Sequence, residues 1–139
     1  MMTRVDIRTM SDSSLAVGSG GPRTVTVDRA REAGGYGLGF NGGELLPLAI
    51  GGCYSNDIFR EAGKRGISVR NVQLTVRAHW SGEPVRAQNV SFDVVVGAAG
   101  TQENLPDLTQ DTDRVAEISN SLRFGTEVKL AELKAIPLR

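Results

Sequence analysis

One stretch, residues 41–66, constrains the fold of this chain more than any other. It opens with Asn41-Gly-Gly, carries apolar residues at helical spacing, and stops at Gly66 after two basic residues. Glu44 falls in the first turn, where a negative charge suits the positive end of a helix dipole. Pro47 is tolerated because it lies near that first turn. The pattern predicts one long helix between two glycine stops.

The predicted helix carries an apolar stripe that contains adjacent glycines. Each glycine inside a helix costs about 1 kcal/mol relative to alanine, so Gly51 and Gly52 need a reason. The simplest reason is close packing against another backbone, and we therefore expect a homodimer whose interface includes the 45–56 face. The stripe consists of Leu45, Leu48, Ala49, Gly52, Cys53 and Asn56, widened by Leu46 and Ile50.

Strand-like alternation surrounds the helix on both sides. Three short strands before it (5–10, 14–17 and 24–27) predict an antiparallel meander, and two after it (69–80 and 90–96) predict a hairpin with a long loop. A second helix is expected from Asp107 or Thr109 to residue 118, followed by a final strand at 126–133. Its inward face is predicted to hold Leu108, Thr112, Val115 and Ile118. Strands, a helix and further strands together predict an α+β fold with mostly antiparallel pairing.

Size and charge limit the classes of partner. The chain has 139 residues, so we expect a single domain spanning 1–139. Its 16 basic and 16 acidic residues cancel, which argues against nucleic acid or an anionic membrane as the main partner. One cysteine excludes an internal disulfide and indicates a reducing compartment. The N-terminus has no apolar signal core, so a cytoplasmic location is expected.

Cys53 is the leading candidate for chemistry, in the middle of the predicted helix. A reactive thiol needs a lowered pKa, and the helix dipole fades after the first turn, so a cation must come from another segment. The alternative is an inert buried thiol, which is common in protein interiors. The arginines on or near the N-terminal strands are the candidate cations: Arg4, Arg8, Arg23, Arg29 and Arg31.

Other patterns give no cofactor site. The glycine-rich loop at 34–43 precedes a helix, but it lacks a phosphate-loop lysine and the dinucleotide fingerprint. His79, the sole histidine, is expected on a solvated strand face. The acidic residues of the second helix have no histidine or further cysteine beside them, so we expect an exposed acidic face rather than a metal site. The sequence predicts neither a bound metal nor a nucleotide cofactor.

Four motifs stand out along the chain: residues 39–46 (GFNGGELL), 49–53 (AIGGC), 66–72 (GISVRNV) and 111–123 (DTDRVAEISNSLR). In combination they resemble the OsmC/Ohr family, named for osmotically inducible protein C and organic hydroperoxide resistance protein. The resemblance implies an intertwined homodimer in which two long helices pack centrally, with six-stranded sheets around them. In peroxidase members, a cysteine at the Cys53 position attacks the peroxide and a second cysteine on the later helix resolves it.

The chain departs from this pattern at two places, so several functions stay open. Near Ile118 and Ser119 there is no second cysteine, and the family's helix-start carboxylate aligns with Gly43, one residue before Glu44. The first hypothesis is a thiol peroxidase that uses Cys53, Glu44 and Arg23 on a small organic hydroperoxide, with an external thiol as reductant. The second is a dimer that binds a small ligand beside Tyr54, Phe40 and Leu48. The third is a structural protein with an inert thiol.

Overall fold

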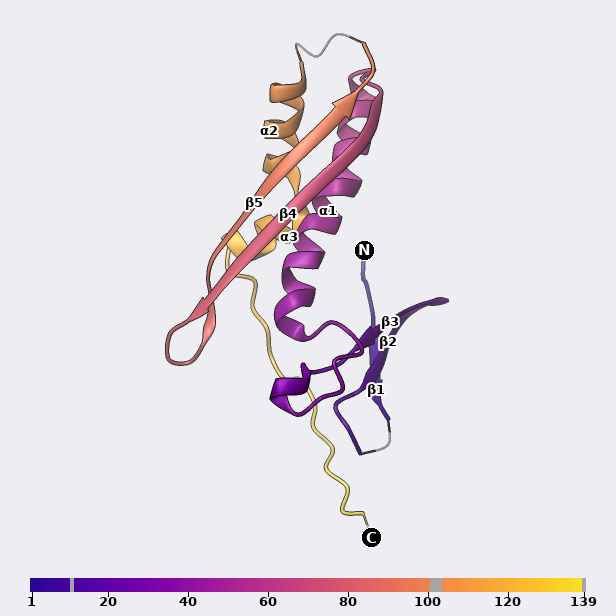
Figure 1. The fold of residues 1–139 in the computed structure, drawn as a ribbon, viewed down its shortest axis with the longest axis vertical. Coiled ribbons are helices and arrows are strands. Elements are labelled where there is room, and N and C mark those ends of the chain that lie inside the picture. The colour runs from indigo at the N-terminus through magenta and orange to yellow at the C-terminus, as the bar shows by residue number, and fades with distance from the viewer. Residues whose placement is uncertain (11, 101–103, 139) are drawn as a thin grey trace.

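The computed structural model describes residues 1–10, 12–100 and 104–138 and has an α+β architecture (Figure 1). Two antiparallel sheets flank a long helix, as the sequence predicts. The elements in chain order are β1 (Asp6–Thr9), β2 (Ala16–Gly20), β3 (Arg23–Val27), the short 3-10 helix η1 (Arg31–Ala33), α1 (Gly42–Lys64), β4 (Val69–Ser81), β5 (Arg86–Ala98), α2 (Leu105–Val115) and α3 (Glu117–Arg123).

The long helix α1 begins and ends where its sequence signals predict. Asn41 is the N-cap, and its side-chain oxygen accepts a hydrogen bond from the backbone N–H of Glu44 at 2.9 Å. The Glu44 carboxylate in turn accepts from the N–H of Asn41 at 3.1 Å, which completes a capping box. After the helix, Gly66 adopts a φ of +66°, a conformation that side chains other than glycine adopt at a cost.

The sheet β1-β2-β3 lies at the N-terminal end of α1, apart from the hairpin (Figure 1). It is the predicted meander, with both neighbouring pairs antiparallel. Phe40 bridges to Val27 just before α1 begins, so the glycine-rich loop returns to the edge of β3. This bridge fixes the start of the helix next to the N-terminal sheet.

The hairpin β4–β5 packs along α1 and forms the core with it. The predicted hairpin is confirmed, although β5 starts at Arg86, so the connecting loop is shorter than expected. The core is a cluster of Tyr54, Ile58 and Ala62 from α1 with Leu108 from α2, all at most 2% exposed. The Tyr54 ring lies 5.2 Å from that of Phe92 on β5, a distance typical of aromatic pairs.

Within the protomer, α1 buries only part of the predicted stripe. Ile50, which belongs to that stripe, is buried with Tyr54 and Ile58 at four-residue spacing, whereas Leu48 remains 49% exposed and Ala49 is also exposed. The helix carries apolar residues on both sides, and periodicity alone does not rank two stripes. Part of the predicted 45–56 face is therefore an uncovered surface of the protomer.

The second helix is divided, which corrects its predicted limits and its inward face. It starts at Leu105, so neither Asp107 nor Thr109 caps it, and Ala116 is extended (ψ 107°) between α2 and α3. Leu108 and Thr112 are fully buried as predicted. Beyond them the buried positions are Ala116 and Ser119 instead of Val115 and Ile118, because the break at Ala116 changes the register of the following turn.

The predicted final strand at 126–133 is wrong for the protomer. Residues 126–138 form neither helix nor strand, and all of them are exposed. The segment runs away from the rest of the molecule (Figure 1). A strand needs a hydrogen-bonding neighbour, and within the described protomer no sheet edge lies beside this segment.

Candidate functional site around Cys53

Cys53 lies near the middle of α1 with a free, half-buried thiol. Its neighbour Tyr54 faces the core at 1% exposure, while Asn56 faces outward. The Cys53 side chain therefore sits at the boundary between the buried stripe of α1 and the uncovered one. A small reactant would approach the sulfur from the uncovered side.

The nearest polar partner of the thiol is a carboxylate. Cys53 Sγ donates to Asp57 Oδ2 at 3.5 Å, and Asp57 is only 5% exposed. Asp57 Oδ1 also pairs with Arg60 Nη1 at 3.3 Å, and the same Arg60 atom lies 3.6 Å from Glu117. The sequence reasoning missed Asp57 because it searched for cations, although the i,i+4 spacing on a helix places both side chains on one face.

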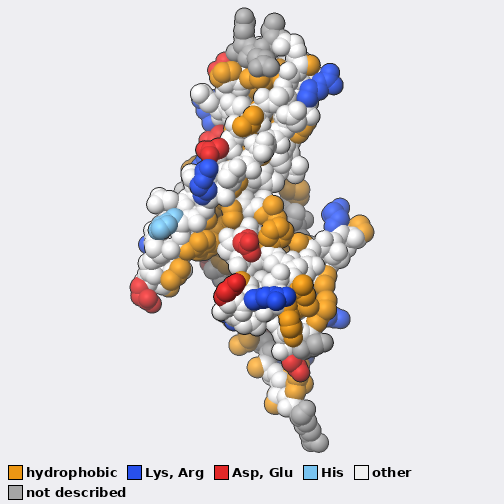
Figure 2. Space-filling view, in the orientation of Figure 1, with side chains coloured by type: hydrophobic (Ala, Val, Ile, Leu, Met, Phe, Trp, Pro, Cys, Tyr) orange, Lys and Arg blue, Asp and Glu red, His pale blue; other side chains and the backbone are white. Residues whose placement is uncertain are grey.

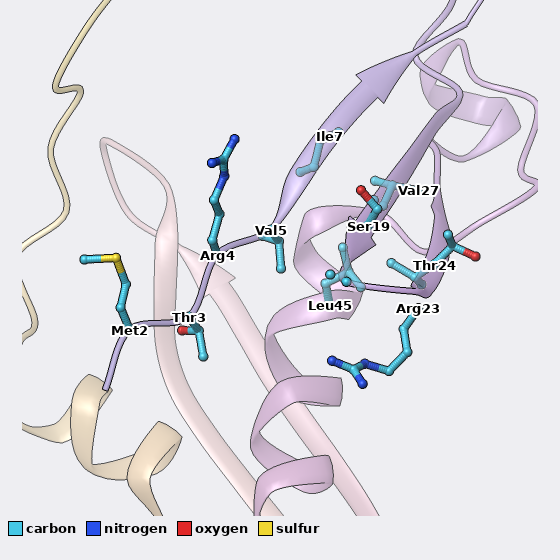
Figure 3. A pocket seen from close by; sticks show the side chains of 14 residues that line it. Met2, Thr3, Arg4, Val5, Ile7, Ser19, Arg23, Thr24, Val27 and Leu45 are labelled. Atoms are coloured by element: carbon cyan, nitrogen blue, oxygen red, sulfur yellow. The ribbon is translucent and has the colours of Figure 1, made fainter.

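Arg23 lies on β3, at the rim of a pocket of about 610 Å³ on the N-terminal sheet (Figure 3). Val5 and Ile7 contribute to its walls, and Leu45 joins the lining from α1. Within the described protomer, no hydrogen bond or ion pair joins Arg23 to Cys53. One protomer alone thus does not bring the predicted thiol and the predicted cation together.

Among the described residues, no hydrogen bond or ion pair joins Cys53 to the other predicted arginines, which are Arg4, Arg8, Arg29 and Arg31. Two of them have partners elsewhere, since Arg4 pairs with Asp6 at 3.0 Å and Arg31 donates to the carbonyl of Tyr36 at 3.2 Å. Any cation that activates Cys53 must therefore come from outside these contacts.

Glu44 performs a structural role in the capping box at the start of α1. Nine residues separate it from Cys53, which is roughly 13 Å along a helix axis. One Glu44 oxygen accepts from the Asn41 N–H, and the other has no partner among the described residues. The residue lines a groove of about 610 Å³ between α1 and β4, which we call the α1/β4 groove.

The α1/β4 groove is mostly apolar. Phe40 and Leu48, two of the residues predicted to line a ligand cleft beside Cys53, contribute to it, although Cys53 does not; Val76 and Trp80 close it from β4. Tyr54 does not line this groove, because its ring is in the core and its hydroxyl donates to the carbonyl of Thr109 at 3.0 Å. Burial, together with the negative charge of Asp113, raises the pKa of Tyr54 to about 12.

The glycine-rich loop wraps around a carboxylate of the chain itself. Asp28 is 2% exposed and accepts hydrogen bonds from the Ser14 hydroxyl and from the backbone N–H groups of residues 29, 36 and 38, at 2.8–3.2 Å. Burial works to raise the pKa of Asp28, but these hydrogen bonds outweigh it and hold the pKa below its usual value. A Cβ at Gly35 would lie 2.1 Å from the Arg29 carbonyl oxygen, so the wrap requires glycine there. The backbone N–H groups around this loop, which would have to donate to a bound phosphate, thus donate to Asp28 instead.

Ser119 occupies the region where the resemblance expects a second cysteine. It is 6% exposed, and its hydroxyl has no partner among the described residues. Within that same part of the chain, no three His, Cys, Asp or Glu side chains are grouped to hold a metal ion, and no helix is long and apolar enough to cross a membrane. The predictions that neither metal nor nucleotide binds are open to elemental analysis and to ATP and NAD titration.

Comparisons with known proteins agree with the resemblance. A sequence model described as OsmC-like protein matches residues 34–131. No protein with a curated description matches the chain. Among solved structures, an OsmC-like protein of unknown function from Vibrio cholerae is 10% identical with a TM-score of 0.76, over 87% of this chain and 93% of that one.

Two further structures have the same fold. An OsmC-like protein from Mycoplasma pneumoniae is 12% identical with a TM-score of 0.76, over 91% of this chain and 89% of that one. A Legionella pneumophila protein described as an organic hydroperoxide resistance protein is 19% identical with a TM-score of 0.63, over 88% of this chain and 90% of that one. At these identities the likeness shows a shared fold, and it confirms the predicted α+β architecture.

Proposed function

Because the chain belongs to the OsmC-like protein family, we propose that it is a homodimeric thiol peroxidase in which Cys53 reduces small organic hydroperoxides. The observation that carries the proposal is the free thiol of Cys53, half-buried at the centre of the helix that defines the fold. The similar structure from Legionella pneumophila is described as an organic hydroperoxide resistance protein, which supports this class of substrate.

The proposed reaction has two stages. The Cys53 thiolate attacks the terminal peroxide oxygen, the O–O bond breaks, and the alkoxide takes up a proton to leave as an alcohol. Cys53 is then a sulfenic acid. An external small thiol displaces water and forms a mixed disulfide, and a second thiol releases Cys53 and carries away the disulfide. This cycle needs no second cysteine in the chain, and it suits a reducing compartment such as the cytoplasm.

Exposed apolar side chains support the homodimer. On α1, Leu48 and Phe59 are each 49% exposed. On the N-terminal sheet, where Figure 2 shows hydrophobic side chains gathered, Val5 and Ile7 are 70% and 64% exposed. Apolar surface spread over two neighbouring elements is typical of a protein interface. A second copy would cover both.

The second copy also offers a source for the missing cation. Arg23 has no partner among the described residues, and guanidinium stays charged when it is partly buried. We assign to Arg23 of the second copy the role of stabilising the Cys53 thiolate. Glu44 of the second copy, which precedes the Leu45 that lines the Arg23 pocket and has one carboxylate oxygen free, is the proposed group that orients this arginine. For the thiol to react, the hydrogen bond from Cys53 to Asp57 must be given up in favour of the contact with Arg23.

Stoichiometric treatment with cumene hydroperoxide, followed by intact mass measurement, tests the proposal. Wild type is expected to gain one oxygen within minutes, and Cys53→Ser to gain none. Arg23→Ala should slow the oxidation far more than Arg8→Ala, which removes a matched arginine from β1. If wild type gains no oxygen and Cys53→Ser consumes peroxide equally, the peroxidase proposal is wrong.

The contact between Cys53 and Asp57 favours a second candidate function, non-enzymatic binding. The Cys53 thiol already donates a hydrogen bond to Asp57, and the apolar α1/β4 groove is large enough for a small ligand. In that case hydroperoxide leaves Cys53 unchanged, while a bound apolar probe shifts the NMR signals of Leu48 and Val76. The mass measurement and the NMR titration together separate the two functions.

A further inference from the structure

A separate cavity of about 290 Å³ lies between α1, β5 and α3, and we call it the α3 cavity. Its walls are largely apolar, with Ile50 from α1, Val90 and Phe92 from β5 and Leu122 from α3. It shares no lining residue with the α1/β4 groove, and Cys53 is not among its lining residues. The α3 cavity is thus separate from the α1/β4 groove and does not include Cys53.

Ser119 brings a polar group to this apolar cavity. It lines the cavity, it is 6% exposed, and its hydroxyl has no hydrogen-bond partner among the described residues. Burying a hydroxyl without a partner is unfavourable, and most buried polar groups are paired. Because the Oγ atom is closed off from solvent, a partner from outside the chain gains a hydrogen bond only where the side chain rotates toward the cavity.

The break between α2 and α3 explains why Ser119 is unpaired. Helical serine and threonine often donate to the carbonyl four residues earlier. Thr112 does so at 2.7 Å and Ser121 at 2.8 Å. For Ser119 that carbonyl belongs to Val115, which lies across the extended Ala116, so the helical geometry is lost.

We propose that the α3 cavity binds a small apolar molecule that carries one neutral hydrogen-bonding group, and that this group pairs with the Ser119 hydroxyl. At about 30 Å³ per water-sized group, the cavity holds at most about ten non-hydrogen atoms. Since the hydroxyl both donates and accepts, an alcohol, a phenol or an amide fits. Binding involves a χ1 rotation of Ser119, because Oγ is closed off from solvent in the empty cavity.

The charge around the cavity selects a neutral group over a carboxylate. Arg123 is the only charged residue among the described residues that line the cavity. Its guanidinium already donates to Asp113 Oδ1 at 2.8 Å and to Asn120 Oδ1 at 3.1 Å. A ligand carboxylate would enter an apolar space without a free counter-charge, which is strongly unfavourable.

NMR titration of the full chain tests the proposal with 4-ethylphenol and with ethylbenzene, which has the same shape without the hydroxyl. We expect 4-ethylphenol to shift the amide signals of Ala87 and Val90 saturably in wild type. Ser119→Ala should weaken its binding roughly threefold to tenfold, the loss of one hydrogen bond, and should leave ethylbenzene binding unchanged. Ser121→Ala is the matched control and should bind both probes as wild type does.

A cavity-filling variant tests the location independently. Ala87→Leu should weaken both probes by at least tenfold, because Ala87 lines the α3 cavity. No saturable shift in wild type, or equal 4-ethylphenol affinity in wild type and Ser119→Ala, would overturn the proposal. Since Cys53→Ser should bind both probes normally, the result does not depend on whether Cys53 reacts with peroxide.

Discussion

Two adjacent glycines of α1 provide the sharpest test of the homodimer. A Cβ added at Gly51 would lie 3.0 Å from Val76 Cγ2, whereas a Cβ at Gly52 would meet nothing within 4 Å in the protomer. Gly63, near the other end of the same helix, is also open. Alanine exceeds glycine in helix stability by about 1 kcal/mol. In an isolated protomer, Gly52→Ala and Gly63→Ala should each raise the free energy of unfolding by about that amount.

If the homodimer packs through the 45–56 face, Gly52→Ala and Gly63→Ala should differ in their effect on dimer stability. The Gly52 methyl group then enters a helix contact, and overpacking of this kind costs about 1–3 kcal/mol. In a symmetric dimer the change occurs once in each copy, so the free energy of dissociation should fall by about 2–6 kcal/mol. That corresponds to a dissociation constant raised about 30-fold or more. Gly63→Ala should leave the dissociation constant unchanged and stabilise the fold.

Sedimentation velocity over a range of protein concentrations measures the dissociation constant, and thermal unfolding measures stability. We expect wild type and Gly63→Ala to be dimers at micromolar concentration, Gly52→Ala to dissociate at higher concentrations than either, and Gly52→Leu to be monomeric. The reasoning is refuted if wild type is a monomer at micromolar concentration. It is equally refuted if Gly52→Ala stabilises the protein as much as Gly63→Ala does and leaves its mass distribution unchanged.

Three further predictions concern buried polar groups. Ser119→Ala should raise the free energy of unfolding by about 1 kcal/mol, because it removes a buried hydroxyl that has no partner among the described residues. Thr112→Val should lower the free energy of unfolding by about 1 kcal/mol, because it removes a hydroxyl that is hydrogen-bonded. Urea denaturation measures both changes. The pKa of Asp28 is lowered in the folded state, so the stabilisation that its carboxylate provides is present above about pH 4 and is lost as the pH falls through the folded pKa. Asp28→Asn should therefore lower Tm at pH 7 and make Tm fall less on acidification, which calorimetry measures. Tyr54→Phe should lower the free energy of unfolding by about 1 kcal/mol and remove the ultraviolet titration step near pH 12.

Local signals explain which elements could be predicted from the sequence. The start of α1 at Asn41 and its end before Gly66 lie where they were predicted, and Glu44 falls in the first turn as predicted, although its capping box with Asn41 was not. The meander and the hairpin followed from alternation within each strand. The division of α2 from α3 had no such signal, because Ala116 is a strong helix former and neither glycine nor proline stands beside it. The helix is interrupted at Ala116 even though alanine has a high helix propensity, and the Ala116 side chain is fully buried at this interruption.

The surroundings of the candidate site depended on contacts that spacing does not reveal. Asp28 and Leu38 are ten residues apart in a loop without periodicity, so their hydrogen bond could not be read from a pattern. Asp57 could have been found, since it lies one helical turn beyond Cys53. The position of Arg23 relative to Cys53 could not, because it depends on how the N-terminal sheet packs and, in our proposal, on a second copy of the chain.

The failed strand at 126–133 shows what an alternating pattern does and does not specify. Alternation determines which side chains share a face of a strand, but the hydrogen bonds must come from a neighbouring edge, and the pattern is silent on which chain supplies it. Val128, Leu130 and Leu133 remain 92%, 78% and 77% exposed in the protomer, so their shared apolar character has no use within it. The uncovered stripe of α1 and the apolar face of the N-terminal sheet are in the same situation. Three segments far apart in the chain are each patterned for burial and each left uncovered in the protomer, and the proposed second copy of the chain would cover all three.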